Sequence, residues 1–229
     1  MSDTVSYEQQ GAVGVITVAN PPVNALSHSV RAGIAEALTA SAADDTEAVV
    51  LCCDGRTFIA GADITEFGKP PQAPSLPDIL VTLENSRKLV VAAIHGTALG
   101  GGFEVSLACH YRCAIESAKV GLPEVKLGLL PGAGGTQRVP RLTGAKFALE
   151  MMTKGNPIAA RKALDVGLVD KILEGNEIAE NAVDYANELV ESSAPLKRVR
   201  DITINDSDLE PDFFDNVRKQ MAKRVLAPF

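Results

Sequence analysis

Two glutamates stand in sequence contexts that suit proton transfer. Glu104 closes the segment HGTALGGGFE (95–104), in which a predicted buried strand runs into three glycines and then into a predicted helix. Glycines allow close approach of a ligand to the backbone, and a helix start offers unpaired N–H groups at its positive end. This arrangement predicts a site for an anion or an oxyanion. Taken alone, Glu104 also fits a simple N-terminal helix charge.

Glu124 lies in a segment whose backbone is unusually restricted. Residues 120–138 hold five glycines and two prolines, and Glu124 is the only acid among them. So many glycines and prolines indicate a shaped pocket wall. A carboxyl group with apolar neighbours tends to have a raised pKa, which suits proton transfer near neutral pH. By itself, the pattern also fits a carboxylate on a surface loop.

A third segment, FIAGADI (58–64), follows an apolar run at 48–53. A turn of small residues there can present a second backbone N–H to a substrate oxygen. The alternative is an ordinary strand-to-helix turn in which Asp63 serves as a cap. The glycines at 100–102 match neither a phosphate-binding Walker loop nor a dinucleotide fingerprint, because the required spacing and the Gly-Lys-Ser/Thr sequence are missing.

The elements that position these segments alternate between strands and helices. Continuous apolar runs predict buried parallel strands at 48–53 and 89–94. The stretch at 11–20 predicts a strand or a hairpin arm, and the stretch at 111–120 predicts a further strand. Apolar residues at helical spacing behind a serine cap predict a helix at 27–41. Further helices are expected at 78–87, 103–109, 146–153, 159–164 and 178–191. The order predicts an α/β fold. We expect a core domain over 1–193 and a C-terminal extension over 194–229 that ends in a basic helix at 217–225.

Composition narrows the function classes. The net charge of −7 argues against a generic nucleic-acid grip, which needs a basic face. No apolar run reaches the length of a membrane span, and MSDTVSYEQQ lacks the features of a secretory signal. The cysteines lie in or beside apolar runs and fit no zinc pattern, so we expect buried thiols and no metal site: Cys52, Cys53, Cys109 and Cys113.

Together, the three segments resemble the crotonase (enoyl-CoA hydratase/isomerase) superfamily. GADI (61–64), ALGGGFE (98–104) and GLPEVKLGLLPGAGGTQR (121–138) carry the match, and PPVNAL (21–26) is similar to the first CoA-side loop of the family. Within the superfamily, ACHYR followed by VGLPEV, and the ending RVLAPF, look most like the N-terminal hydratase part of peroxisomal-type multifunctional β-oxidation enzymes. The resemblance implies a crotonase-like superhelix of ββα turns with C-terminal helices.

The resemblance also assigns roles to single residues. Ala62 and Gly101 match the two backbone donors of the family's oxyanion hole, and Glu104 and Glu124 match the catalytic carboxylates. Contacts with the substrate or with CoA are implied for Ala60, Asp63, Ile64, Val23 and Leu99. One departure is Thr65, which stands where many members have a lysine that binds the CoA phosphates.

The implied activity is hydration of 2-trans-enoyl-CoA thioesters in fatty-acid β-oxidation, with no cofactor, because CoA is part of the substrate. The alternatives are Δ3-Δ2-enoyl-CoA isomerisation at the same site and a non-catalytic crotonase-like binding protein. A serine hydrolase is disfavoured, since the chain has no Gly-x-Ser-x-Gly and its three histidines lie in no convincing base context. The expected partners are an acyl-CoA, further copies of the chain in a homo-oligomer such as a trimer, or a dehydrogenase part. The expected location is the bacterial cytoplasm, or the peroxisome if the chain is a piece of a eukaryotic multifunctional enzyme.

Overall fold

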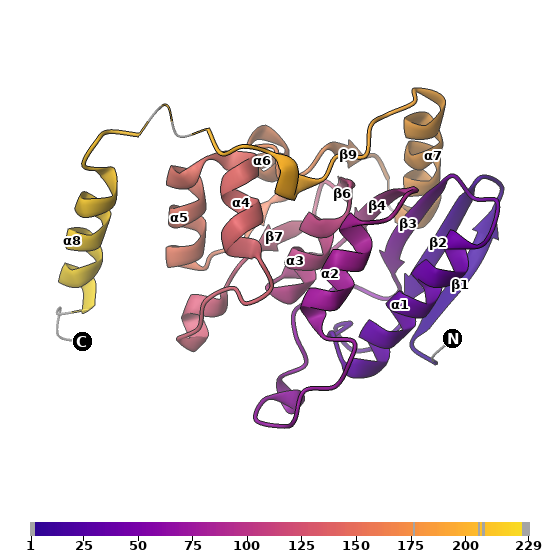
Figure 1. Cartoon of the computed structure of the whole chain (residues 1–229), viewed down its shortest axis with the longest axis horizontal. Helices are drawn as coiled ribbons and strands as arrows, with labels where there is room; N and C mark the ends of the chain where they lie inside the picture. Colours follow the sequence, from indigo (N-terminus) through magenta and orange to yellow (C-terminus); the bar gives the residue numbers. More distant parts are fainter. Residues whose placement is uncertain (1–2, 176, 206, 208, 226–229) are drawn as a thin grey trace.

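A six-stranded sheet forms the centre of the protein (Figure 1). The computed structural model describes residues 3–175, 177–205, 207 and 209–225. Across the sheet, the strands follow the order β1 (Val5–Gln10), β2 (Val13–Val18), β3 (Ala48–Cys53), β4 (Leu89–Ile94), β6 (Tyr111–Ile115) and β9 (Lys171–Leu173). The β1–β2 hairpin is antiparallel, and the other neighbours are parallel.

Helices cover both faces of this sheet, which explains the continuous apolar runs. Alternate residues of β3 point to opposite faces: Val49 and Leu51 join one core cluster, whereas Val50 and Cys52 join the other. On the first face lie α1 (His28–Ala42), α2 (Leu76–Glu84) and α3 (Gly101–Ala108), and α7 (Ile178–Glu191) packs against the other face (Figure 1). The strands predicted at 48–53 and 89–94 and the helix predicted at 178–191 are confirmed.

A small second sheet contains β5 (Thr97–Leu99), β7 (Lys119–Gly121) and β8 (Ile158–Ala159). In two successive units the chain adds one strand to the large sheet, the next strand to the small sheet, and then a helix. The units are β4–β5–α3 and β6–β7–α4, where α4 spans Gly135–Thr143. These ββα turns are those expected of a crotonase-like superhelix.

One predicted strand is wrong. The apolar stretch 111–120 contains both β6 and β7, because a turn closed by the bond from Ala118 N–H to Ile115 O, 3.0 Å, sends the chain from one sheet to the other. The helix α4 was also not predicted, since its first residue belongs to a glycine-rich segment. The remaining helices are α5 (Ala145–Lys154), α6 (Ala160–Asp165) and α8 (Phe213–Val225), with single 3-10 turns η1 (Ile64–Glu66), η2 (Glu124–Leu127) and η3 (Val199–Asp201).

The chain after residue 193 has two parts. The first returns to the core, where Tyr111 OH donates to Pro195 O over 3.0 Å and Val199 is buried. The second ends in α8, which stands apart from the body in Figure 1. The residues at 226–229, the end of the RVLAPF segment, lie outside the described residues. Among the described residues, no helix is both long and apolar enough to span a membrane.

Candidate active site

Four segments that are distant in sequence enclose one cavity of about 380 Å³. They are the turn after β3, the start of α2, the start of α3, and the η2 region with the loop that follows it. The lining residues are Ala60, Gly61, Ala62, Ile64, Phe67, Leu76, Pro77, Gly100, Gly101, Glu104, Pro123, Glu124, Leu127, Leu129, Leu130, Gly132 and Ala133. Among the described residues that line the cavity, only Glu104 and Glu124 have ionisable side chains. The cavity is otherwise apolar, as is typical of ligand sites with a few oriented polar groups.

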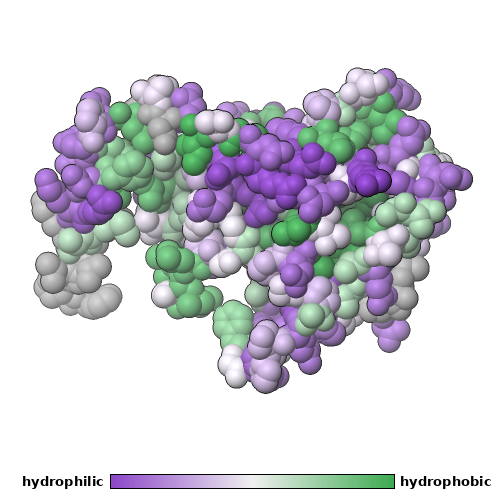
Figure 2. Space-filling model, in the orientation of Figure 1, coloured by the Kyte–Doolittle hydropathy of each residue, from purple (hydrophilic) through white to green (hydrophobic). Residues whose placement is uncertain are grey.

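Apolar side chains form the rim of the cavity. Leu127 and Leu130 are 68% and 78% exposed, and Ile64 and Phe67 on the opposite side are also exposed. Figure 2 shows the apolar projection that η2 and the following residues form at the lower edge of the molecule. Large exposed apolar groups at a cavity mouth indicate a surface that binds an apolar ligand or partner.

Glu104 is buried and is held by the start of another helix. Glu104 is 2% exposed, and its Oε1 accepts hydrogen bonds from the amides of Ala133 at 2.9 Å and Gly135 at 2.7 Å. Burial raises the pKa of Glu104, whereas the two amides and the nearby charge of Arg138 act to lower it. The first turn of α3 presents Glu104 here because Gly100 adopts φ 53° and ψ −126°, a conformation that favours glycine.

Glu124 differs from Glu104 in its contacts. It opens η2, and its Oε2 is buried without a hydrogen-bond partner among the described residues. Burial raises the pKa of Glu124, a hydrogen bond from its own backbone amide acts to lower it, and the negative charge of Glu104 acts to raise it. A carboxyl group of this kind holds a proton at a higher pH than an exposed glutamate does.

Ala62 and Gly101, whose backbone amides are the predicted oxyanion donors, both line this cavity. The turn at Gly61, with φ 134°, and the bond from Leu26 N–H to Gly61 O, 2.9 Å, set the peptide of Ala62 beside the first turn of α3. A Cβ placed on Gly101 would lie 3.7 Å from the nitrogen of Ala62. Within the described part of the chain, neither the amide of Ala62 nor that of Gly101 has a hydrogen-bond acceptor. Two such donors beside a cavity can bind an oxygen on which negative charge develops.

The other residues implied by resemblance lie around this centre. Ala60 and Ile64 line the cavity, and Ala60 N–H donates to Val23 O over 3.2 Å. Leu99 N–H donates to Ile59 O over 3.1 Å, so Val23 and Leu99 support the wall through the backbone and are not among its lining residues.

Asp63 faces an adjoining pocket of about 720 Å³ that also contains Arg31, Thr65 and Lys69. Its carboxylate accepts from Thr65 N–H at 2.9 Å and so caps η1, as the capping alternative predicted. Arg31 is paired with Glu66 at 2.9 Å.

An ion pair behind the cavity was not predicted. Arg138 donates through Nε and Nη2 to the two carboxylate oxygens of Glu84, each at 2.9 Å. Both residues are buried. Glu84 and Arg138 lie 54 positions apart, and no rule of sequence spacing connects residues at that separation. The sequence shows only that one is a charged residue in a largely apolar helix and the other a charged residue at the end of a glycine-rich segment.

The histidines and cysteines take no part in this site. His95 Nε2 contacts Gly55 O at 3.1 Å, and His110 Nδ1 accepts from Val90 N–H at 3.0 Å. All four cysteines are buried and unbridged, as predicted. Within the described ranges, no group of three His, Cys, Asp or Glu residues is placed to hold a metal ion.

The comparisons with known proteins agree with this architecture. The family model described as Enoyl-CoA hydratase/isomerase matches residues 8–221, and the chain belongs to that family. Its sequence is 43% identical over 221 residues to the peroxisomal bifunctional enzyme of Danio rerio, covering 95% of this chain and 31% of that protein. It is 42% identical over 200 residues to a probable enoyl-CoA hydratase of Bacillus subtilis, covering 83% of this chain and 78% of that protein.

Solved structures show the same fold. The enoyl-CoA hydratase of Bacillus anthracis superposes with a TM-score of 0.76 at 34% identity, covering 82% of this chain and 77% of that one. A probable enoyl-CoA hydratase/isomerase of Mycobacterium abscessus superposes with a TM-score of 0.75 at 29% identity, covering 99% and 92%. The chain spans about a third or less of the length of the bifunctional relatives it matches.

Proposed function

We propose that the chain is an enoyl-CoA hydratase that adds water to 2-trans-enoyl-CoA thioesters in fatty-acid β-oxidation. One observation carries the proposal: the same apolar cavity is lined by the buried Glu104, the half-buried Glu124, and two residues whose backbone amides have no acceptor among the described residues. Addition of water to a conjugated thioester needs a group that accepts a proton from water, a group that gives a proton to Cα, and donors for the enolate oxygen. The four groups of this cavity match those needs.

The amides of Ala62 and Gly101 bind the thioester oxygen in this mechanism. When the water oxygen adds to Cβ, negative charge moves to the thioester oxygen. Two donors in fixed positions stabilise this charge without any rearrangement of the backbone. Loss of one such donor typically costs about 10²–10³ in rate. Because both donors are backbone groups, their positions depend on the turn at Gly61 and on the start of α3.

The two glutamates divide the proton transfers. Both hydrogen bonds to Glu104 reach Oε1, which leaves Oε2 to orient a water molecule and take its proton. Glu124, whose pKa is raised by burial, delivers a proton to Cα. The water oxygen bonds to Cβ, Glu104 gains the proton that the water loses, and Glu124 loses the proton that Cα gains, so that the total charge of the carboxyl pair does not change.

The CoA part of the substrate fits the adjoining pocket. Lys69 lies there and supplies a cation for phosphate, which the family lysine would supply at the position of Thr65. Arg31 in the same pocket is already paired with Glu66. The reaction uses no cofactor, because CoA enters and leaves as part of the substrate.

Isomerisation of 3-enoyl-CoA is the second candidate activity. It passes through a dienolate whose oxygen the same two amides can bind, and one carboxylate moves the proton from Cα to Cγ. Oε2 of Glu124, which has no hydrogen-bond partner among the described residues, suits that task. The proposed partners are further copies of the chain or a linked dehydrogenase part. The proposed location is the bacterial cytoplasm or the peroxisome, since the relatives include peroxisomal bifunctional enzymes and a bacterial protein. A non-catalytic binding role is disfavoured, because both carboxyl groups face the cavity.

Product analysis in oxygen-18 water tests the proposal. The protein is incubated with 2-trans-enoyl-CoAs of short and long chain, and the products are identified by mass spectrometry. We expect 3-hydroxyacyl-CoA that carries the heavy isotope at C3. Recovery of unchanged thioester at every chain length would contradict the proposal, and hydrolysis to free CoA would indicate another reaction class.

A further inference from the structure

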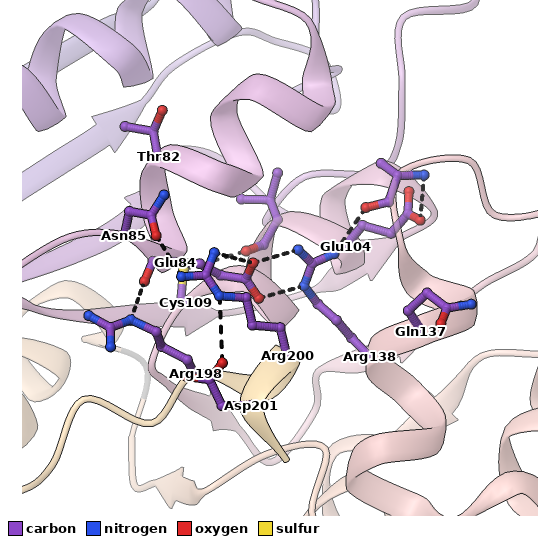
Figure 3. Close-up of polar contacts among 12 residues, drawn as sticks. Thr82, Glu84, Asn85, Glu104, Cys109, Gln137, Arg138, Arg198, Arg200 and Asp201 are labelled. Carbon is purple, nitrogen blue, oxygen red and sulfur yellow. Dashed lines mark hydrogen bonds and ion pairs between the residues drawn. The ribbon is translucent and has the colours of Figure 1, made fainter. Parts of the chain in front are cut away.

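Behind the cavity, a buried ion pair supports the loop that holds Glu104 (Figure 3). Glu84 ends α2 and is 2% exposed, and Arg138 lies in the first turns of α4 and is 9% exposed. Their two parallel hydrogen bonds of 2.9 Å fix the guanidinium plane. A buried ion pair is weak support for stability, because desolvation offsets much of the attraction. Its position therefore calls for another reason.

The third contact of Arg138 supplies that reason. Its Nη1 donates to Ala133 O over 3.0 Å, while the N–H of the same Ala133 donates to Glu104 Oε1 over 2.9 Å. Ala133 is thus held on its carbonyl side by Arg138 and on its amide side by Glu104. Glycines flank it at 132 and 134, and such a loop has high backbone freedom unless something fixes it.

The loop is packed directly on the guanidinium group. A Cβ placed on Gly134 would lie 2.3 Å from Arg138 Nη1. Gly134 has φ 101°, and its carbonyl accepts the backbone N–H of Arg138 over 2.9 Å. Both amides that bind Glu104 therefore belong to a loop whose shape is set by Arg138.

We infer that Arg138, oriented by Glu84, is a positioning residue for Glu104. Glu84 fixes the guanidinium, the guanidinium fixes the loop at 132–135, and the loop amides fix the carboxylate. The catalytic consequence of this chain of contacts rests on the proposed function, whereas the contacts themselves can be tested without it. Neither Glu84 nor Arg138 lines the cavity, so neither touches the reacting atoms.

The charge of Arg138 acts on Glu104 as well. The charged groups that face Glu104 are Arg138 from α4 and Glu124 from η2, with Glu84 on the far side of Arg138. Arg200 from η3 reaches the outer side of Glu84, at 3.8 Å from Oε2. Removal of the positive charge of Arg138 should raise the pKa of Glu104 further, since that charge acts to lower it.

The first test is the double variant Glu84→Gln/Arg138→Met, which leaves no uncompensated buried charge. We expect kcat for hydration to fall about 10–100-fold, because a misplacement of about 1 Å in a catalytic geometry can cost about 10²-fold in rate. KM should stay within about twofold, and the acid limb of the pH profile should move to higher pH. Arg200→Met is the matched control. It removes the positive charge that lies near the carboxylate of Glu84, but it removes no contact with the loop at 132–135, and it should leave kcat unchanged.

A second variant, Arg138→Lys, separates geometry from charge. Lysine can pair with Glu84 but lacks the planar fork that reaches Ala133 at the same time. We expect a folded protein with an unmoved acid limb, a lower kcat, and faster hydrogen–deuterium exchange at the amides of Ala133 and Gly135. Exchange of these two amides needs no substrate, so it decides the inference even if the wild type does not hydrate enoyl-CoA.

Two results would overturn the inference. One is a wild-type kcat in the double variant. The other is unchanged exchange at Ala133 and Gly135 in both variants, whatever the activity. Absence of hydration in the wild type would instead contradict the proposed function.

Discussion

The carboxylate of Glu104 accepts a hydrogen bond of 2.7 Å from the backbone amide of Gly135, which lies 31 positions further along the chain. Gly135 is the first residue of α4, and Glu104 belongs to the first turn of α3. The starts of two helices therefore meet at one cavity. The amide of Gly101 at one start is proposed to bind the substrate oxygen, and the amide of Gly135 at the other holds the carboxylate.

Replacement of Glu104 should separate the two candidate reactions. Glu104→Ala removes the proposed water-binding carboxylate, and loss of general acid–base catalysis costs about 10²–10⁴ in rate. We expect hydration to fall by that factor and isomerisation of a 3-enoyl-CoA to fall much less, since isomerisation uses Glu124 as its proton shuttle. Parallel assays of both reactions measure the difference. An equal loss of both, or of neither, would refute this division of roles.

The pH profile should reflect the raised pKa of the buried Glu104. Glu104 must be ionised to accept a proton, and its pKa is raised by burial above the ordinary value of 4.5. The value of kcat/KM should therefore fall as the pH decreases through a midpoint above 4.5. Glu116→Gln is the control, because Glu116 is exposed and pairs with Arg161 on the surface. A profile that stays flat below 4.5, with the protein still folded, would be incompatible with the proposed base.

Gly102 should tolerate no side chain. A Cβ on Gly102 would lie 2.0 Å from the carbonyl oxygen of Ile59, a contact that requires the start of α3 to move. Gly102→Ala should lower the free energy of unfolding by at least about 1–3 kcal/mol, the usual cost of overpacking. The control is Gly132→Ala, where a Cβ meets nothing within 4 Å. Denaturant unfolding compares the two, and equal stability of both variants would show that the close approach of α3 to residue 59 is wrong.

Asp44 should control stability in acid. Although partial burial acts to raise it, hydrogen bonds from Thr46, Tyr7 and Lys88 hold the pKa of Asp44 well below its usual value of 3.8. The stabilisation is therefore complete above 3.8 and is lost as the pH falls toward the lower folded-state pKa. Asp44→Asn should be less stable than wild type at neutral pH, and the gap should narrow in acid. A gap that stays constant between neutral pH and strong acid would contradict this linkage.

Local patterns predicted the elements in which burial is either uniform, as in β3, or repeats at helical spacing, as in α7. The run AVVLCC is buried on both faces of the sheet, so its strand was predicted with its true bounds. The stretch 111–120 was predicted as one strand, whereas it forms two strands in different sheets. Apolar character does not tell which of two sheets a residue joins. The helix α4 was not predicted, because the glycines at its start are more typical of a loop than of a helix.

Resemblance predicted the residues that line the site, but it did not predict the ion pair that supports them. Glu104, Glu124, Ala62 and Gly101 were expected to act together from motif resemblance, and the fold brings all four to one cavity. Their assigned roles stay predictions. The support behind Glu104 depends on a pair between Glu84 and Arg138, whose contact exists only once α2 and α4 have packed beside α3.

Hydration of a 2-trans-enoyl-CoA by Glu124→Gln, measured beside wild type and Glu116→Gln, tests the central claim most directly. The substitution keeps the shape of the side chain and replaces the acidic carboxyl group by an amide, which cannot deliver a proton to Cα. We expect wild type and Glu116→Gln to consume the conjugated thioester at the same rate. Glu124→Gln should be slower by about 10²–10⁴ while it still binds the 3-hydroxyacyl-CoA product. Hydration by Glu124→Gln at the wild-type rate would contradict the account.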